Sequence, residues 1–427
     1  MLALGGPGNL QQTTSYKVVL PFYVYAGISF IVGTIMLLLH TDVIQSHYFN
    51  PFTLAITHVM ALGWGLMIIF GASHQLVPVL IEGKLDSNSL AYATFLFAGI
   101  GIPFIVAGFY GFNLGWMIQT GAILVNIGVL CYLANILTSA FKSGKHDVHS
   151  WFVVTAALWL FATTFLGLLL VLNFTKPLLP SDSVAYLTIH AHLGIVGWFL
   201  LLVIGVASRL IPMFLISKYT NNKSLWWIYV LINSSLISFL FFKLFNLDSY
   251  FYYISMIMAL AAILLFARHI KRAHKVRIRK NVDEQMKISL LSVLQMLLPF
   301  VVLIAVLFLL PTEKNNIILL YGFCIFFGWL TAIILGMTFK TLPFIIWNRT
   351  YHKKAHAGKT PAPKELFNPR IYNAMAIIYV VGFVIFIVGI VLINNVLLKT
   401  GAIALLITAL LYVFNTTIAL THKPKKI

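Results

Sequence analysis

The sequence contains twelve apolar stretches of about twenty or more residues, separated by short polar segments. They lie near 18–39, 53–81, 89–111, 113–139, 151–173, 184–216, 225–245, 250–268, 288–310, 316–347, 372–393 and 396–421. A helix needs about 20 apolar residues to cross a bilayer, and these stretches lack the alternation of barrel strands. Only 9% of the residues are charged, against roughly 25% in soluble proteins. We therefore predict an all-α polytopic membrane protein with about 12 transmembrane helices.

A common frame recurs in the second, sixth and tenth stretches, each of which holds a reference proline. Counting back from that proline, a Gly-Trp pair lies 15 and 14 residues before it and a glycine lies 7 residues before it. The frames are 58–78, 192–212 and 323–343, and their members are Gly63, Trp64, Gly71 and Pro78, then Gly197, Trp198, Gly205 and Pro212, then Gly328, Trp329, Gly336 and Pro343. Chance coincidence in an apolar sequence is the alternative explanation.

Near-equal spacing of the frames favours an internal repeat over chance. The frames start 192 − 58 = 134 and 323 − 192 = 131 residues apart. Matching motifs at a fixed period indicate repeated structural units. We predict three pseudo-symmetric four-helix repeats, about 17–140, 150–270 and 288–421, within a single membrane domain that covers 1–427.

The charge distribution predicts the orientation. The formal net charge is +19, and basic residues such as Lys142, Lys218 and Lys275 gather after the even-numbered stretches. Asp42 and Asp182 lie in the opposite loops. The positive-inside rule then places both termini in the cytoplasm, and we expect a bacterial inner membrane. Juxtamembrane bases account for the charge, so the predicted partner is the lipid bilayer and not a nucleic acid.

Four histidines lie inside the apolar stretches, where ionisable groups are costly and commonly functional: His58, His74, His190 and His192. His58 and His192 hold the same frame position, 20 residues before the proline, so we expect them at one height. In the third frame that position is Phe323. Two neutral imidazoles at one depth are suited to haem iron or copper. The alternative is two structural histidines, each hydrogen-bonded to a carbonyl or hydroxyl group.

The other two histidines have different expected roles. His190 precedes His192 by two residues, which is about 200° around a helix. One of them could then be a ligand while the other lines an outer vestibule, or both could bind one ion if the helix begins a turn later. His74 follows His58 by sixteen residues, about 24 Å along the helix, so we expect a polar role for it. The candidate cofactor residues are His58 and His192, and the candidate metal ligands are His58, His190 and His192.

These features resemble subunit I of the haem-copper oxidases and nitric oxide reductases. The stretch from His58-Val-Met to Leu-Val-Pro78 is similar to that family's second helix, whose early histidine ligates the low-spin haem. The stretch from His192 through Gly205 to Pro212 is similar to the helix whose histidine ligates the second metal. The resemblance implies haem, with copper as a second cofactor, and a redox partner in a respiratory chain. It also implies electron transfer or a role in oxygen or nitric oxide respiration.

The sequence departs from that family at two helices. The family has adjacent histidines in its seventh helix and a His-x-His motif in its tenth, whereas 225–245 and 316–347 contain no histidine. We therefore expect no complete binuclear centre. The NnrS family, twelve-span haem and copper proteins linked to nitric oxide tolerance, is a precedent. Whether the chain is an enzyme stays open. The alternative from another class is a non-redox transporter or assembly factor with a histidine-lined polar path.

Overall fold

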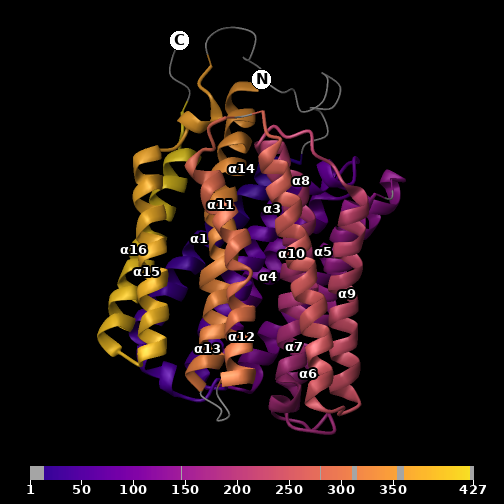
Figure 1. The fold of residues 1–427 in the computed structure, drawn as a ribbon, viewed down its shortest axis with the longest axis vertical. Coiled ribbons are helices and arrows are strands. Elements are labelled where there is room, and N and C mark those ends of the chain that lie inside the picture. Colours follow the sequence, from indigo (N-terminus) through magenta and orange to yellow (C-terminus); the bar gives the residue numbers. More distant parts are fainter. Residues whose placement is uncertain (1–13, 146, 279, 310–314, 353–359, 424–427) are drawn as a thin grey trace. The chain divides into compact units, whose positions relative to one another are not determined.

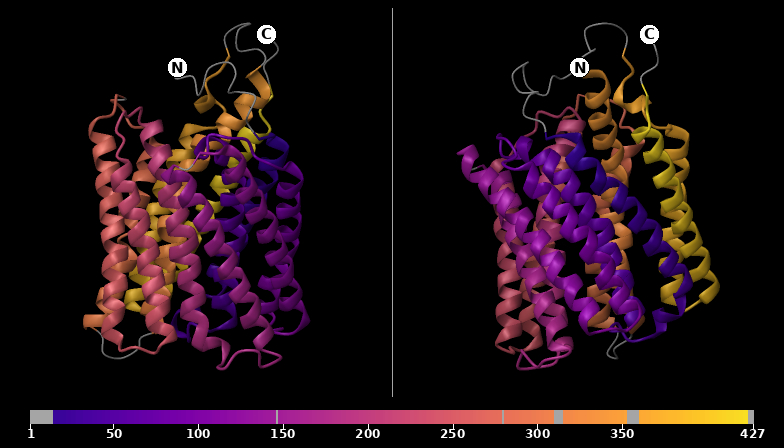
Figure 2. Two further views of the ribbon diagram at one scale, coloured as in Figure 1. Left: turned by 90° about the vertical axis from the view of Figure 1, so that its right-hand side faces the viewer. Right: turned by 180° about the vertical axis from the view of Figure 1, so that it is seen from behind.

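The computed structural model describes residues 14–145, 147–278, 280–309, 315–352 and 360–423. These residues form helices and no strand (Figures 1 and 2). In these ranges 12 helices are long and apolar enough to cross a membrane: 16–39, 51–80, 88–110, 116–143, 148–173, 183–214, 222–244, 252–275, 284–305, 316–351, 369–392 and 395–420. The predicted class is therefore confirmed, and the protein is an integral membrane protein with an all-α fold.

The helical segments follow the predicted stretches to within a few residues. The segments in the first two predicted repeats are α1 (Tyr16–Leu39), η2 (Thr41–Gln45), α2 (Pro51–His58), η3 (Val59–Leu66), α3 (Met67–Leu80), α4 (Asn88–Tyr110), α5 (Trp116–Ser143), α6 (Val148–Asn173), η4 (Ser183–Tyr186), α7 (Leu187–His192), η5 (Leu193–Leu200), α8 (Leu201–Phe214), α9 (Asn222–Leu244), η6 (Ser249–Phe251) and α10 (Tyr252–Lys275). Those of the third are α11 (Glu284–Gln295), α12 (Leu298–Leu309), α13 (Asn315–Phe323), η7 (Cys324–Leu330), α14 (Thr331–Tyr351), η9 (Pro363–Glu365), α15 (Pro369–Leu392) and α16 (Asn395–Leu420).

The chain forms two compact units. Unit 1 contains 70–281 with the residues up to Val19, and unit 2 contains 20–69 together with 282–427. In unit 1, α9 and α10 pair lengthwise, and in unit 2, α15 and α16 do the same (Figure 1). The continuous helix 51–80 contributes to both units, because the boundary falls between Ile69 and Phe70. The units follow contacts and not sequence similarity, so the predicted repeat boundaries stay a prediction.

All three frames begin with the same change of helix type, a feature that the sequence did not reveal. An ordinary helix ends at the first frame position, at His58, His192 and Phe323, and a π-helix follows at once. The π-helices are η3, η5 and η7. A π-turn is rare and often marks a functional site. The frame is thus repeated in structure as well as in sequence, and His58 and His192 occupy equivalent local positions.

The frame glycine seven residues before the proline allows close helix packing. Gly205 on α8 faces the Phe152 side chain of α6, and an added Cβ would lie 2.7 Å from Phe152 Cγ. Gly336 on α14 faces Ser289 and Gln285 of α11, where a Cβ would lie 2.7 Å from the Gln285 carbonyl oxygen. Small residues let membrane helices approach closely. In both repeats the frame helix therefore packs on the first helix of its own repeat.

The glycine of the Gly-Trp pair follows the same rule in two repeats only. A Cβ on Gly63 would lie 2.7 Å from Ser29 Cβ on α1, and one on Gly197 would lie 2.8 Å from Trp159 Cβ on α6. In the third repeat Gly328 leaves helical geometry, with φ −86° and ψ −112°. The repeat without a frame histidine is thus also the one with a kinked π-helix.

Side chains satisfy the carbonyl groups that this kink releases. The Tyr379 hydroxyl lies 2.9 Å from the Phe327 carbonyl oxygen and 2.9 Å from that of Gly328. Ser292 Oγ donates to the Trp329 carbonyl oxygen at 2.8 Å. Buried backbone groups need such partners, and membrane helices tolerate a break only where neighbouring side chains supply them. Neighbouring side chains of unit 2 therefore stabilise the kink.

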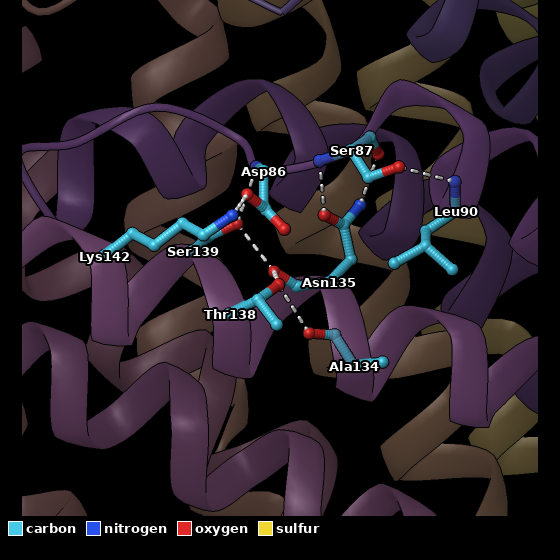
Figure 3. A network of polar contacts seen from close by, with 8 residues as sticks. All are labelled: Asp86, Ser87, Leu90, Ala134, Asn135, Thr138, Ser139 and Lys142. Carbon is cyan, nitrogen blue, oxygen red and sulfur yellow. Dashed lines mark hydrogen bonds and ion pairs between the residues drawn. The ribbon is translucent and has the colours of Figure 1, made fainter.

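Two buried asparagines each hold the N-cap residue of a neighbouring helix through both of its backbone groups, an arrangement that we call the amide clamp. Asn135 on α5 accepts from the Ser87 N–H at 3.0 Å and donates to the Ser87 carbonyl at 2.8 Å (Figure 3). Asn415 on α16 bonds both backbone groups of Asn368, at 2.8 and 3.0 Å. Ser87 and Asn368 are the N-caps of α4 and α15. This amide clamp is shared by the first and third repeats.

Replacing a clamp asparagine is expected to destabilise the protein. Asn415→Leu leaves the N–H and C=O groups of Asn368 without their partner, which costs about 2 kcal/mol or more. We expect a clearly lower melting temperature in detergent, measured by scanning fluorimetry. Thr400→Leu is the matched control, because Thr400 is exposed on the same helix and bonds only the Val396 carbonyl. Equal melting temperatures for the two variants would contradict a stabilising clamp.

Candidate cofactor-binding histidines

His58 is the last residue of α2, in unit 2. Its Nδ1 atom lies 2.7 Å from the Leu54 carbonyl oxygen, one helical turn earlier. Because a carbonyl oxygen only accepts hydrogen bonds, Nδ1 carries the proton and Nε2 carries the lone pair. The side chain is half-buried. The local helix therefore fixes both the orientation of the imidazole and its tautomer.

His192 has the same arrangement in unit 1, as the last residue of α7. Its Nδ1 atom lies 2.8 Å from the Thr188 carbonyl oxygen, again one turn earlier. Its ring lies 4.7 Å from that of Phe239 on α9, measured between centroids. The two frame histidines thus share a position, a backbone hydrogen bond and a tautomer. Their local geometry is therefore the same, and the expectation that they lie at one height stays a prediction.

Both histidines fit the demands of a metal ligand. A ligating imidazole commonly donates its other ring N–H to a backbone carbonyl, which fixes the tautomer. Two such neutral imidazoles are a usual donor set for haem iron. His58 belongs to unit 2 and His192 to unit 1. That the two approach one another therefore stays a prediction.

His190 faces a different helix from His192. Its Nδ1 atom lies 3.1 Å from the Thr163 carbonyl oxygen of α6, and it packs over Gly167, where a Cβ would come 2.8 Å from its Cε1 atom. Both histidines lie within α7, which begins at Leu187, so the later helix start considered above is not observed. The rings point to α6 and α9, as a separation of about 200° predicts. Metal ligation by His190 stays a prediction.

His74 is fully buried on α3 in unit 1. Its ring meets the Tyr132 ring edge-on, with centroids 5.6 Å apart. Its own carbonyl accepts from Thr14 Oγ1 at 2.6 Å. The polar role expected for His74 stays a prediction.

The third frame replaces the histidine by an aromatic cluster. The Phe323 ring stacks on Phe327, Phe383 and Phe386, with centroids 5.0, 5.5 and 4.4 Å apart. Within the described ranges, no group of three or more His, Cys, Asp and Glu side chains is arranged to hold a metal ion. Any metal bound by the frame histidines would therefore have few protein ligands, as haem iron does.

The second and third frames each have a basic residue three positions before the proline, Arg209 and Lys340, and both side chains pair with acids. Lys340 forms an ion pair with Asp283 in unit 2. Arg209 Nη2 lies 3.7 Å from Glu82 in unit 1, and Lys145 pairs with the same carboxylate. The hydrogen bond and charge of Lys145 lower the pKa of Glu82 below its ordinary value. Both frame bases therefore take part in ion pairs with acidic side chains of their own unit.

Comparison of the sequence with protein-family models finds no match, and comparison with curated proteins finds none either. The resemblance to subunit I of the haem-copper oxidases therefore rests on this chain's own frame and histidines. That resemblance stays a prediction.

Proposed function

We propose that this integral membrane protein binds haem through His58 and His192 and transfers electrons or responds to a diatomic gas in a respiratory membrane. The observation that carries the proposal is the shared geometry of the two histidines. Each ends a helix before a π-helix, and each donates Nδ1–H to the carbonyl one turn earlier. Both imidazoles then present an Nε2 lone pair, which is the form that binds iron.

The chemistry proposed excludes a complete binuclear centre of the oxidase type. The helix α9 and the span 316–351 contain no histidine, so the second metal would lack the ligands that subunit I uses. A copper ion, if it is bound, would rely on His190 or His192. Haem held by two imidazoles supplies reversible one-electron chemistry. This favours electron transfer or gas sensing over sustained reduction of oxygen or nitric oxide.

The membrane placement is part of the proposal. Lysines and arginines of the loops after the even-numbered spans support cytoplasmic termini in a bacterial inner membrane. In that orientation the two frame histidines lie toward the outer face, and a redox partner would dock there or receive electrons within the membrane.

A reduced-minus-oxidised absorption spectrum of the purified protein tests the proposal directly. We expect the sharp α-band of a low-spin haem and iron in a fixed ratio to protein. The measurement also separates the proposal from a non-redox transporter or assembly factor, which gives a flat difference spectrum. For this test the protein is expressed with haem supplied. A flat difference spectrum, together with no iron in the purified protein, would refute haem binding.

A further inference from the structure

Two histidines of unit 1 have buried ring nitrogens with no bond to the described protein. His149 is the second residue of α6 and His269 lies near the end of α10; they are 6% and 3% exposed. His149 Nε2 and His269 Nδ1 are fully enclosed and have no hydrogen-bond partner among the described residues. Buried polar atoms nearly always have a partner, so two orphaned nitrogens require an explanation.

The two imidazoles belong to one region of the unit. The helix α8 packs against both α6 and α10. The charge effect of His149 on His269 indicates that both buried rings belong to the same part of unit 1. The Tyr219 ring covers His269 from one side, edge-on at 5.0 Å between centroids. The pair is thus enclosed by helices and an aromatic ring.

By its spacing along the sequence, His269 corresponds to the clamp asparagines of the other repeats. The clamp asparagines follow the N-cap residue of their partner helix by 48 and 47 residues. His269 follows Asn221, the N-cap of α9, by 269 − 221 = 48 residues. An imidazole cannot bond both an N–H and a C=O group as an amide does. By this spacing, the second repeat has an imidazole, which cannot form the double backbone bond, where the first and third repeats have a clamp amide.

The side chain of Asp147 orients His149. Asp147 is the N-cap of α6 and accepts from the Ser150 N–H at 2.9 Å, and its Oδ2 atom lies 3.3 Å from His149 Nδ1. A carboxylate oxygen accepts hydrogen bonds, so it accepts the hydrogen bond of Nδ1–H and leaves the lone pair of the neutral imidazole on the enclosed Nε2 atom.

We propose that His149 Nε2 and His269 Nδ1 together bind a divalent transition-metal ion of the zinc or copper class. Imidazole nitrogen is a preferred ligand for these ions. Asp147 then accepts the Nδ1–H of His149, as carboxylates commonly do at metal-bound histidines, and contributes negative charge to the region. Water completes the coordination. The nearby Arg209 and Lys145 are already paired with Glu82, which limits their repulsion of a cation.

Metal titration of the full-length protein in detergent tests this site. Zn²⁺ is titrated against a chromogenic chelator, and Cu²⁺ is used in parallel for electron paramagnetic resonance. We expect one site of high affinity, with couplings from two nitrogens in the copper spectrum. His149→Gln and His269→Gln should each weaken Zn²⁺ binding at least tenfold. Asp147→Asn keeps a good helix cap and should weaken it about 10- to 100-fold.

The matched control is His274→Gln, on the same helix α10. The His274 ring bonds Arg277 and lies outside the proposed site. The Zn²⁺ affinity of the His274→Gln variant should therefore equal that of the unmodified protein. If the glutamine variants at 149 or 269 do not fold, Asp147→Asn still decides the question. Affinity unchanged in all folded site variants, or reduced equally in the control, overturns the proposal. Iron content and haem spectrum report separately on His58 and His192, so the two sites cannot be confused.

Discussion

Replacing His58 or His192 by alanine is expected to convert a low-spin haem spectrum to a high-spin one. If both imidazoles ligate one iron, either replacement leaves that iron five-coordinate. The sharp α-band should then be lost in both variants, and the Soret band should move in the same direction. The change is measured on purified protein in the oxidised and reduced states, with iron and copper determined on the same samples. No other substitution considered is expected to alter the spectrum as much.

The matched control is His190→Ala, which removes a neighbouring histidine that faces α6. Because His190 contacts Thr163 and packs over Gly167, its loss should leave the spectrum nearly unchanged. A different outcome would support a copper site beside the haem: loss of copper in the His190 and His192 variants, with the haem spectrum kept. If all three variants match the unmodified protein and contain no metal, these histidines are structural.

A large side chain at Gly205 is expected to prevent folding. The Gly205 position already lies against Phe152, so even a methyl group requires α6 and α8 to separate. In Gly205→Leu the two helices cannot keep their contact, which removes packing worth several kcal/mol, a large part of the stability of a typical protein. We expect little monodisperse protein in gel filtration and strong loss of expression in the membrane.

Gly322→Ala is the control for helix propensity and expression. A Cβ at Gly322 on α13 meets no atom within 4 Å, so alanine fits without strain. The variant should fold as the unmodified protein does, and alanine in a helix should stabilise it slightly. Gly205→Leu protein with a normal elution profile would show that α6 and α8 tolerate a larger separation than their contact indicates.

Composition and periodicity predicted the spans because lipid imposes a single requirement on every crossing segment. Runs of about 20 apolar residues can only be helices there, so the predicted stretches and the observed helices agree closely. The frame also predicted which histidines are equivalent. His58 and His192 prove to share a backbone bond as well as a sequence position.

The features that the sequence did not predict depend on contacts between distant segments. A π-helix has no composition of its own. The carbonyl groups at the kink bond to distant side chains: Ser292 lies 37 residues from Trp329, and Tyr379 lies 51 residues from Gly328. The amide clamp is visible in the sequence only as a spacing of 48 or 47 residues, which has no meaning until the partner helices are known. Nothing in the sequence indicates that ring nitrogens of His149 and His269 are enclosed, because the helices that cover them come from distant segments.

The two-part composition of unit 2 has a consequence for biosynthesis. Its first segment, 20–69, leaves the ribosome 281 − 69 = 212 residues before its second segment begins. At about 5–20 residues per second, that interval lasts roughly 10–40 s. During this time Trp64 lacks the Thr331 hydroxyl that later accepts its ring N–H at 3.1 Å. The helix that carries His58 is therefore in the membrane before its partner segment of unit 2 has been synthesised. Unit 1, in contrast, is fully synthesised once residue 281 has emerged.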